Sequence, residues 1–174
     1  MISKTMSDAI NKQINAELYS SYLYLSMVAY FESINLPGAA HWMNIQVQEE
    51  LGHAVKFFNF VNERRGRVIL TGIEGPPSQW DSPLAAFEAV LEHEQMVTGL
   101  INNLADLAMT EKDHASGIFL QWFVTEQVEE ESSADAIIQK TKLAGDAPGA
   151  VLMLDQELAT RPAPTMPTED QGQQ

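Results

Sequence analysis

The sequence predicts an all-α protein: a four-helix bundle with a long crossover between its second and third helices and a short fifth helix at the C-terminus. Apolar residues recur at alternating steps of three and four along four long stretches, the pattern of helices with one buried face. The link after the second stretch is long enough to cross a whole bundle. The one β-like run, residues 68–70, is too short to carry a sheet.

The first two helices are predicted over residues 6–34 and 39–65. Between them, residues 35–38 contain Pro and Gly, which favour a turn because Pro fixes φ and Gly permits positive φ. A link this short makes the second helix antiparallel to the first. The second helix ends on two arginines followed by Gly66, a favourable helix C-terminus.

The third and fourth helices are predicted over residues 83–109 and 113–144. Residues 66–82 are rich in Gly and Pro and have no helical period, so they form the crossover. A crossover of this length allows the third helix to run parallel to the second. Ser82 followed by a proline is a typical helix start.

A short fifth helix is predicted to start at Pro148 and to end near Leu158. We assign residues 1–160 to one domain. Residues 161–174 are rich in Pro, Thr and Gln, so they are too polar to pack against a core. They are predicted to form a mobile tail.

Composition narrows the classes of function. The 174 residues carry a formal charge of −14, which argues against nucleic acid as a partner because phosphate contacts need clustered Lys and Arg. No apolar run approaches the ~20 residues of a membrane span, and the N-terminus lacks the features of a secretion signal. The lack of cysteine excludes disulfides, zinc–thiolate sites and iron–sulfur clusters, and it is compatible with a cytoplasmic protein.

Glu50 and His53 lie three residues apart in the predicted second helix, on a face that also carries apolar residues. A buried carboxylate and a buried imidazole each lose hydration, which is costly if they stay unpaired. A metal ion removes that cost because it keeps the acid ionised and the imidazole neutral. The pair alone is a weak signal, since Glu-x-x-His is common.

Every long helix carries a glutamate on its apolar stripe near its midpoint: Glu17, Glu50, Glu94 and Glu130. Packed helices of similar length align their midpoints, so these carboxylates are expected to converge beside His53 at one level of the core. Four buried like charges repel one another unless a cation lies between them. The alternative interpretation is that the helix faces are misassigned and the glutamates are solvated.

Oxygen-rich ligation with one imidazole suits iron(II) or manganese(II) rather than zinc, which favours more nitrogen or sulfur donors. Two metal ions bridged by Glu50 and Glu130 would share the negative charge. Tyr24 lies two turns after Glu17 on the same face, and therefore near the pair. Two interpretations of Tyr24 stay open, a redox role or a core tyrosine hydrogen-bonded to a buried acid.

The chain resembles the bacterial non-haem ferritins over residues 1 to about 160. The resemblance rests on the short fifth helix and on a set of polar residues: Glu17, Tyr24, Glu50-x-x-His53, Glu94 and Gln127-x-x-Glu130. It implies a ferroxidase, in which dioxygen or hydrogen peroxide oxidises iron(II) and ferric mineral is stored inside a hollow cage of twenty-four identical subunits. It also implies catalytic roles for Tyr24 and Gln127 and a set of iron ligands: Glu17, Glu50, His53, Glu94, Gln127 and Glu130.

Two departures from related families refine this assignment. Most di-iron oxygenases and bacterioferritins have a second Glu-x-x-His, but here Glu130 is followed at that spacing by Ser133. Gln127 instead occupies the position at which ferritins hold one iron ion less tightly, so that the iron can leave. Bacterioferritins ligate haem through a Met after the first bridging glutamate; this chain has Leu51 there, so no haem is expected.

Three further glutamates flank the predicted centre: Glu49, Glu126 and Glu129. Glu49 and Glu129 each precede a bridging glutamate by one residue, a rotation of about 100°, so both are expected to face away from the bundle axis. The resemblance implies that these acids form a third iron site. The alternative is a solvated acidic face that holds no ligand.

Other classes of function remain. The main alternative is a di-iron redox enzyme, such as a peroxidase or oxygenase, that stores no mineral; the single Glu-x-x-His and the fifth helix count against it. A rubrerythrin-like protein would need cysteine pairs, and a DNA-protecting mini-ferritin would be expected to carry a basic tail. A purely structural shell subunit would not need the inner ligands. Val151, Leu152 and Leu154 are too apolar for an exposed short helix, so copies of the fifth helix are expected to pack at a symmetry axis of the shell.

Overall fold

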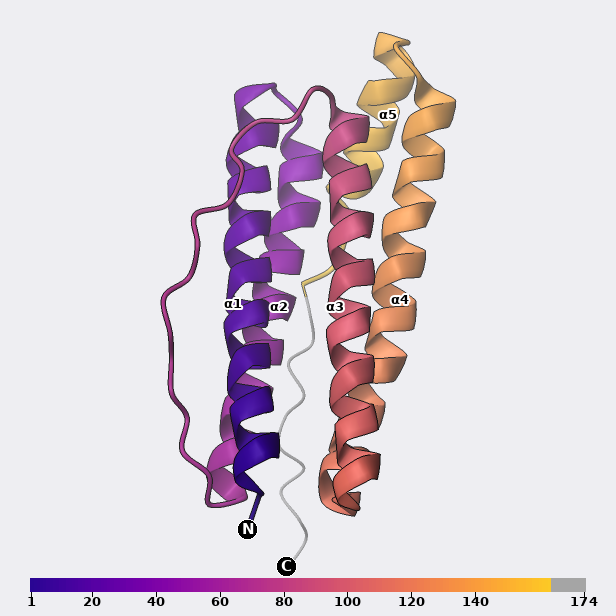
Figure 1. Ribbon diagram of the computed structural model, residues 1–174. Helices are drawn as coiled ribbons and strands as arrows, with labels where there is room; N and C mark the ends of the chain where they lie inside the picture. The colour runs from indigo at the N-terminus through magenta and orange to yellow at the C-terminus, as the bar shows by residue number, and fades with distance from the viewer. Residues whose placement is uncertain (164–174) are drawn as a thin grey trace, which may run out of the picture.

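The computed structural model describes residues 1–163, which form five helices and contain no strand. Their bounds are α1 (Lys4–Ser33), α2 (Pro37–Glu63), α3 (Pro83–Glu111), α4 (His114–Ala144) and α5 (Pro148–Leu158). Figure 1 shows the four long helices side by side, with α2 and α3 parallel to each other and antiparallel to α1 and α4. The predicted fold class is confirmed, and the helix bounds lie within about two residues of those predicted. The predicted mobility of residues 164–174 falls outside the described residues.

The crossover, residues 64–82, runs the length of the bundle along α1 (Figure 1). Polar side chains of α1 hold it there. The amide of Asn11 donates to the carbonyl of Arg67 at 3.0 Å, and the hydroxyl of Ser26 donates to the carbonyl of Pro77 at 2.6 Å. Because the crossover returns the chain to the end where α2 begins, α3 starts there and runs parallel to α2.

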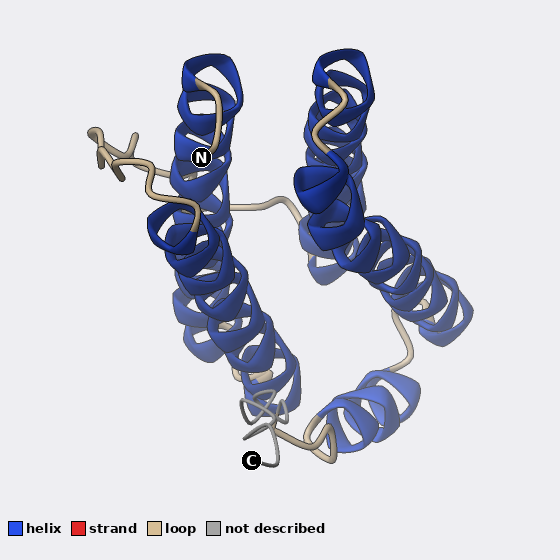
Figure 2. Ribbon diagram, turned by 90° about the horizontal axis from the view of Figure 1, so that it is seen from below, coloured by secondary structure: helices blue, strands red, loops and turns tan. Residues whose placement is uncertain are grey.

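The core consists of two apolar clusters, one toward each end of the bundle. Figure 2 shows the backbone of the bundle from below. In one cluster Phe31 and Phe87 stack with ring centroids 5.1 Å apart; in the other Phe57 and Phe123 stack at 4.0 Å. The four mid-helix glutamates lie between these clusters along the sequence of every long helix, and all four are buried. Apolar packing on both sides therefore keeps this polar layer away from water.

The fifth helix packs against α2 and α4 and completes the start of α2. Ser3 and Ser82 cap α1 and α3 with their side-chain oxygens, but the N-cap residue of α2 is Leu36, which cannot. Asp155 of α5 takes this role, since its Oδ1 accepts a hydrogen bond from the backbone N–H of Ala39 at 2.8 Å.

The apolar residues of α5 divide into two sets. Leu154 and Leu158 pack against the bundle core of their own chain, and Val151 is partly buried. Leu152 and Met153 are 58% and 72% exposed. The expected partner surface is thus supplied partly by the chain itself, while Leu152 still faces solvent. No helix in residues 1–163 is long and apolar enough to cross a membrane.

Candidate metal centre

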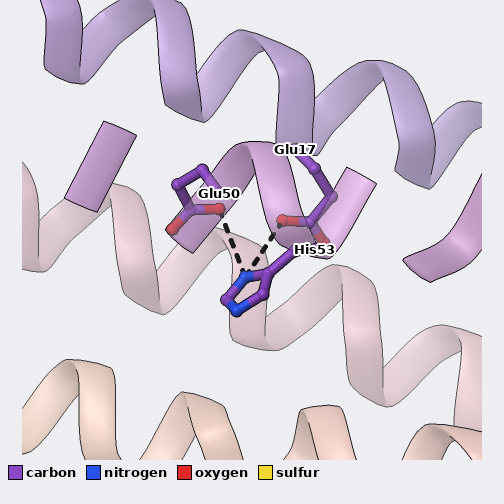
Figure 3. A group of neighbouring side chains, drawn as sticks. All are labelled: Glu17, Glu50 and His53. Atoms are coloured by element: carbon purple, nitrogen blue, oxygen red, sulfur yellow. Dashed lines mark ion pairs between the residues drawn. The ribbon is translucent and has the colours of Figure 1, made fainter. Parts of the chain in front are cut away.

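Glu17 of α1 and Glu50 and His53 of α2 form a buried group at the middle of the bundle. One ligand atom from each residue lies within 4.8 Å of the others. His53 Nδ1 is 3.5 Å from Glu50 Oε2 and 3.9 Å from Glu17 Oε2. Figure 3 shows both carboxyl groups directed at the imidazole. The short link between α1 and α2 makes this possible, because it places the midpoints of the two helices opposite each other.

Two oxygens of this group have no protein partner. Glu17 Oε1 accepts a hydrogen bond from Gln13 Nε2 at 2.8 Å, but Glu17 Oε2 and Glu50 Oε2 have no hydrogen-bond partner among the described residues. Buried oxygens of this kind are rare because the loss of hydration is not compensated. Both face the imidazole, so a single cation can contact all three side chains. This donor set, oxygen with one imidazole, fits iron(II).

Glu94 of α3 is engaged by two neighbours. The hydroxyl of Tyr24 donates to Oε1 of Glu94, and Gln127 Nε2 donates to its Oε2 at 3.1 Å and to its main-chain carbonyl at 3.2 Å. Both candidate catalytic residues, Tyr24 and Gln127, therefore contact the same carboxylate. Of the two interpretations of Tyr24, the hydrogen bond to a buried acid is present.

Glu130 of α4 is held by a different residue. Gln46, which is fully buried, donates from Nε2 to Glu130 Oε2 at 2.7 Å. The six predicted ligands thus fall into three groups. They are the group of Glu17, Glu50 and His53, the pair Glu94 and Gln127, and Glu130 with Gln46.

The protonation states of the candidate ligands reflect their burial and mutual repulsion. Burial raises the pKa of Glu17 to about 7 and, with the charge of Glu94, that of Glu130 to about 8. Burial and the charges of Glu94, Glu17 and Glu130 raise the pKa of Glu50 well above its usual value. Burial lowers the pKa of His53 to about 4, so this imidazole is neutral at pH 7. A neutral imidazole among acids that repel one another favours a bound cation.

The metal-free protein is expected to lose stability as the pH rises from about 6.5 to about 8. An unfolded glutamate ionises near pH 4.5, whereas the folded chain keeps a proton on Glu17 to about pH 7 and on Glu130 to about pH 8. Burial lowers the pKa of His53 and His93 to about 4, and these two groups oppose the trend below about pH 6.5; above it the folded state binds more protons, so raising the pH to about 8 favours unfolding. Ionising Glu17 alone costs roughly 3 kcal/mol.

Melting temperatures of the metal-free protein between pH 6.5 and pH 8 check this expectation. Glu130→Gln should flatten the decline, because the amide does not ionise, while Glu92→Gln on the exposed face of α3 should leave it unchanged. A melting temperature that rises across the interval would contradict the assigned pKa directions.

The outer acids are less buried than the central group. Glu49 and Glu126 are partly buried and Glu129 is exposed. Burial raises the pKa of Glu49 and of Glu126. Within the described residues these three do not come as close together as the central group does. Their candidate role as a third iron site is therefore separate from the buried centre.

Two cations lie beside these acids. Arg161 Nη2 is 2.7 Å from Glu49 Oε2. Lys56 lies over the ring of Trp122, 3.4 Å from its centroid, and its charge lowers the pKa of Glu126 against the effect of burial. Trp122 in turn meets His53 edge to face, at 5.3 Å between ring centroids.

Sequence reasoning missed three residues that contact this region. Gln13 lies four residues before Glu17 on the same helix face, and this spacing was an available signal. Gln46 lies four residues before Glu50 but donates to Glu130 of another helix, which the spacing does not indicate. Arg161 carries no such signal, because it sits in a stretch whose composition predicts a mobile tail. The structure instead places Arg161 in contact with α2.

A four-helix bundle with a long crossover and a buried carboxylate–imidazole group at its midpoint defines a class, the ferritin-like metal-binding bundles. A family model described as a ferritin-like domain matches residues 7–144. The bacterial non-heme ferritin of Bacteroides fragilis is 47% identical over 161 residues, which are 92% of this chain and all of that protein. The bacterial non-heme ferritin of an Escherichia coli strain is 36% identical over 160 residues, 92% of this chain and 97% of that one.

Solved structures agree with these relatives. The open-pore ferritin of the hyperthermophilic archaeon Archaeoglobus fulgidus is 58% identical, with a TM-score of 0.92 over 93% of this chain and all of that one. The chain belongs to the ferritin family. The resemblance to bacterial non-haem ferritins is confirmed, and iron storage with iron oxidation is the function that this membership supports.

Proposed function

We propose that this chain is a ferroxidase that oxidises iron(II) at the buried centre and stores the product as ferric mineral. Twenty-four copies form a hollow cage, which we place in the cytoplasm. The observation that carries the proposal is the group of Glu17, Glu50 and His53, all buried and within 4.8 Å of one another, with two carboxylate oxygens that have no partner among the described residues. The ferritin relatives support the storage of iron.

Each candidate ligand has a role in this proposal. Glu17, Glu50 and His53 bind one iron(II) through oxygen and imidazole nitrogen. Glu94, Glu130 and Gln127 bind the second, and Glu50 and Glu130 bridge the two ions. Tyr24 and Gln127 orient Glu94, since each donates a hydrogen bond to one of its oxygens.

The redox chemistry balances with either oxidant. Each iron(II) gives up one electron, so a pair of iron ions reduces dioxygen to hydrogen peroxide or hydrogen peroxide to water, with protons taken from solvent. The raised pKa values of Glu17 and Glu130 mean that iron binding displaces protons from the folded chain. Iron uptake should therefore be accompanied by proton release.

The outer acids form the third, weaker iron site of this proposal. Glu49 and Glu126 are partly buried and Glu129 is exposed, and none of the three is an imidazole. Carboxylate oxygens without nitrogen hold iron loosely, which suits ions in transit between the centre and the mineral.

One experiment separates storage from the alternative, a di-iron redox enzyme without mineral. The protein is loaded with iron(II) in air, passed over a size-exclusion column, and analysed for iron per chain. We expect elution at the mass of a large assembly, with many more iron ions per chain than the ligand sets can hold. Iron that stops at the number of ligand sites would favour the redox enzyme.

A further inference from the structure

Arg161 follows the end of α5 by three residues and returns to the surface of α2. Its guanidinium lies over the ring of Trp42, 4.5 Å from the centroid, and Nη1 donates to the carbonyl of Trp42 at 3.4 Å. Its main-chain carbonyl oxygen is 2.9 Å from Nε2 of His41. The side chain is only 21% exposed. None of these contacts involves an acid.

The same guanidinium contacts two residues next to the metal centre. Nη2 is 2.7 Å from Glu49 Oε2, and Nη1 donates to Oε1 of Gln46. Gln46 then donates from Nε2 to Glu130. A guanidinium can only donate hydrogen bonds, so it orients the amide of Gln46 with the oxygen toward Arg161 and the nitrogen toward Glu130. One side chain thus acts on an outer acid directly and on a candidate ligand through Gln46.

A cation therefore already lies on Glu49. Guanidinium–carboxylate hydrogen bonds are charge-assisted and stronger than neutral ones, and this pair is about four-fifths buried on both sides. A divalent cation on the same carboxylate would lie within a few ångströms of the guanidinium, where like charges repel. Iron at Glu49 therefore competes with Arg161 for this carboxylate.

We propose that Arg161 is a latch on the outer acids, which occupies Glu49 until a divalent cation displaces it. This proposal rests on the third iron site proposed above. Arg161 is a positioning residue, because it acts through Glu49 and Gln46 and not on the reacting atoms. The latch couples the docking of the C-terminal segment on α2 to the affinity of the outer acids for metal.

The test is an anaerobic titration of the assembled, metal-free protein with cobalt(II), which does not undergo the oxidation. Absorption spectra and equilibrium dialysis separate tight from weak equivalents. In Arg161→Gln the weak equivalents should bind about tenfold more tightly, a change of about 1.4 kcal/mol. The affinity of the tight equivalents at the buried centre should change much less, because Arg161 reaches Glu130 only through Gln46. Arg161→Lys keeps the positive charge, so its weak binding should stay close to that of the wild type.

Two further variants make the result specific. Lys140→Gln removes the same charge from an ion pair with Glu157 of α5, away from Glu49, and should change nothing. Glu49→Gln should lose the weak binding whether or not Arg161 is present.

The outcomes distinguish the two proposals. Weak binding that survives Glu49→Gln would refute the third site itself, and the latch with it. Weak binding that Glu49→Gln removes but Arg161→Gln leaves unchanged would refute the latch alone. Equal tightening in Arg161→Lys and Arg161→Gln would overturn it as well, because a loosened C-terminal segment rather than the lost charge would then be the cause.

Discussion

Replacing Glu50 or His53 by Ala should abolish the fast phase of iron(II) oxidation while leaving assembly intact. Both side chains belong to the buried group, and each substitution removes a donor that the rest of the group cannot replace. Loss of residues that only support a ligand costs ten- to a hundredfold, so loss of a ligand should slow the fast phase more than about a hundredfold. Stopped-flow absorbance of the ferric product measures it.

Folding should respond differently from oxidation. Glu50 is buried, and its Oε2 has no hydrogen-bond partner among the described residues; its removal ends this uncompensated loss of hydration, so the metal-free variant should be at least as stable as the wild type. His114→Ala and Glu92→Gln, both at exposed positions, serve as matched controls and should oxidise iron at the wild-type rate. Wild-type oxidation in both Glu50→Ala and His53→Ala would rule out this centre.

Gly38→Ala should displace α5 from the bundle. A Cβ at Gly38 would lie 1.7 Å from the main-chain carbonyl oxygen of Asp155. A main-chain atom cannot move away by a change of rotamer, as the end of a flexible side chain can. Movement of α5 would also break the bond from Asp155 to the N–H of Ala39. Overpacking costs about 1–3 kcal/mol, and loss of a helix cap adds about 1 kcal/mol. Thermal unfolding and hydrogen exchange of the α5 amides measure the effect.

Gly99→Ala is the matched control, because a Cβ there has no neighbour within 4 Å. It should stabilise α3 by up to about 1 kcal/mol, since Gly is a poor residue in a helix interior. We expect Gly38→Ala to resemble a deletion of residues 148–174, with the four-helix bundle folded but the cage weakened or its pores opened. A deletion of 162–174 should do neither. A Gly38→Ala protein as heat-resistant and iron-retaining as the wild type would refute this role of α5.

The sequence by itself determined the fold and the candidate ligands. Helical periodicity over four long stretches sets their length, and the Gly- and Pro-rich residues 66–82 set the crossover. The ligand candidates were visible because Glu17, Glu50, Glu94 and Glu130 are acids on apolar stripes, where an acid without a partner is costly. Both signals are local, since they depend on spacing within one helix.

Only the tertiary structure decided which groups meet. The candidate ligands separate into three groups because Gln46 and Gln127 each reach a particular carboxylate on another helix. No pattern within one helix specifies such contacts between helices.

The same holds for α5 and the segment after it. The cap of α2 comes from Asp155, more than a hundred residues later, and the cation on Glu49 comes from Arg161, in a stretch whose composition predicts a mobile tail. Spacing along a helix reports which face a residue occupies. Contacts between residues far apart in the chain depend on how the helices pack, so the amide partners, the α2 cap and the Arg161 pair emerged only from the folded structure.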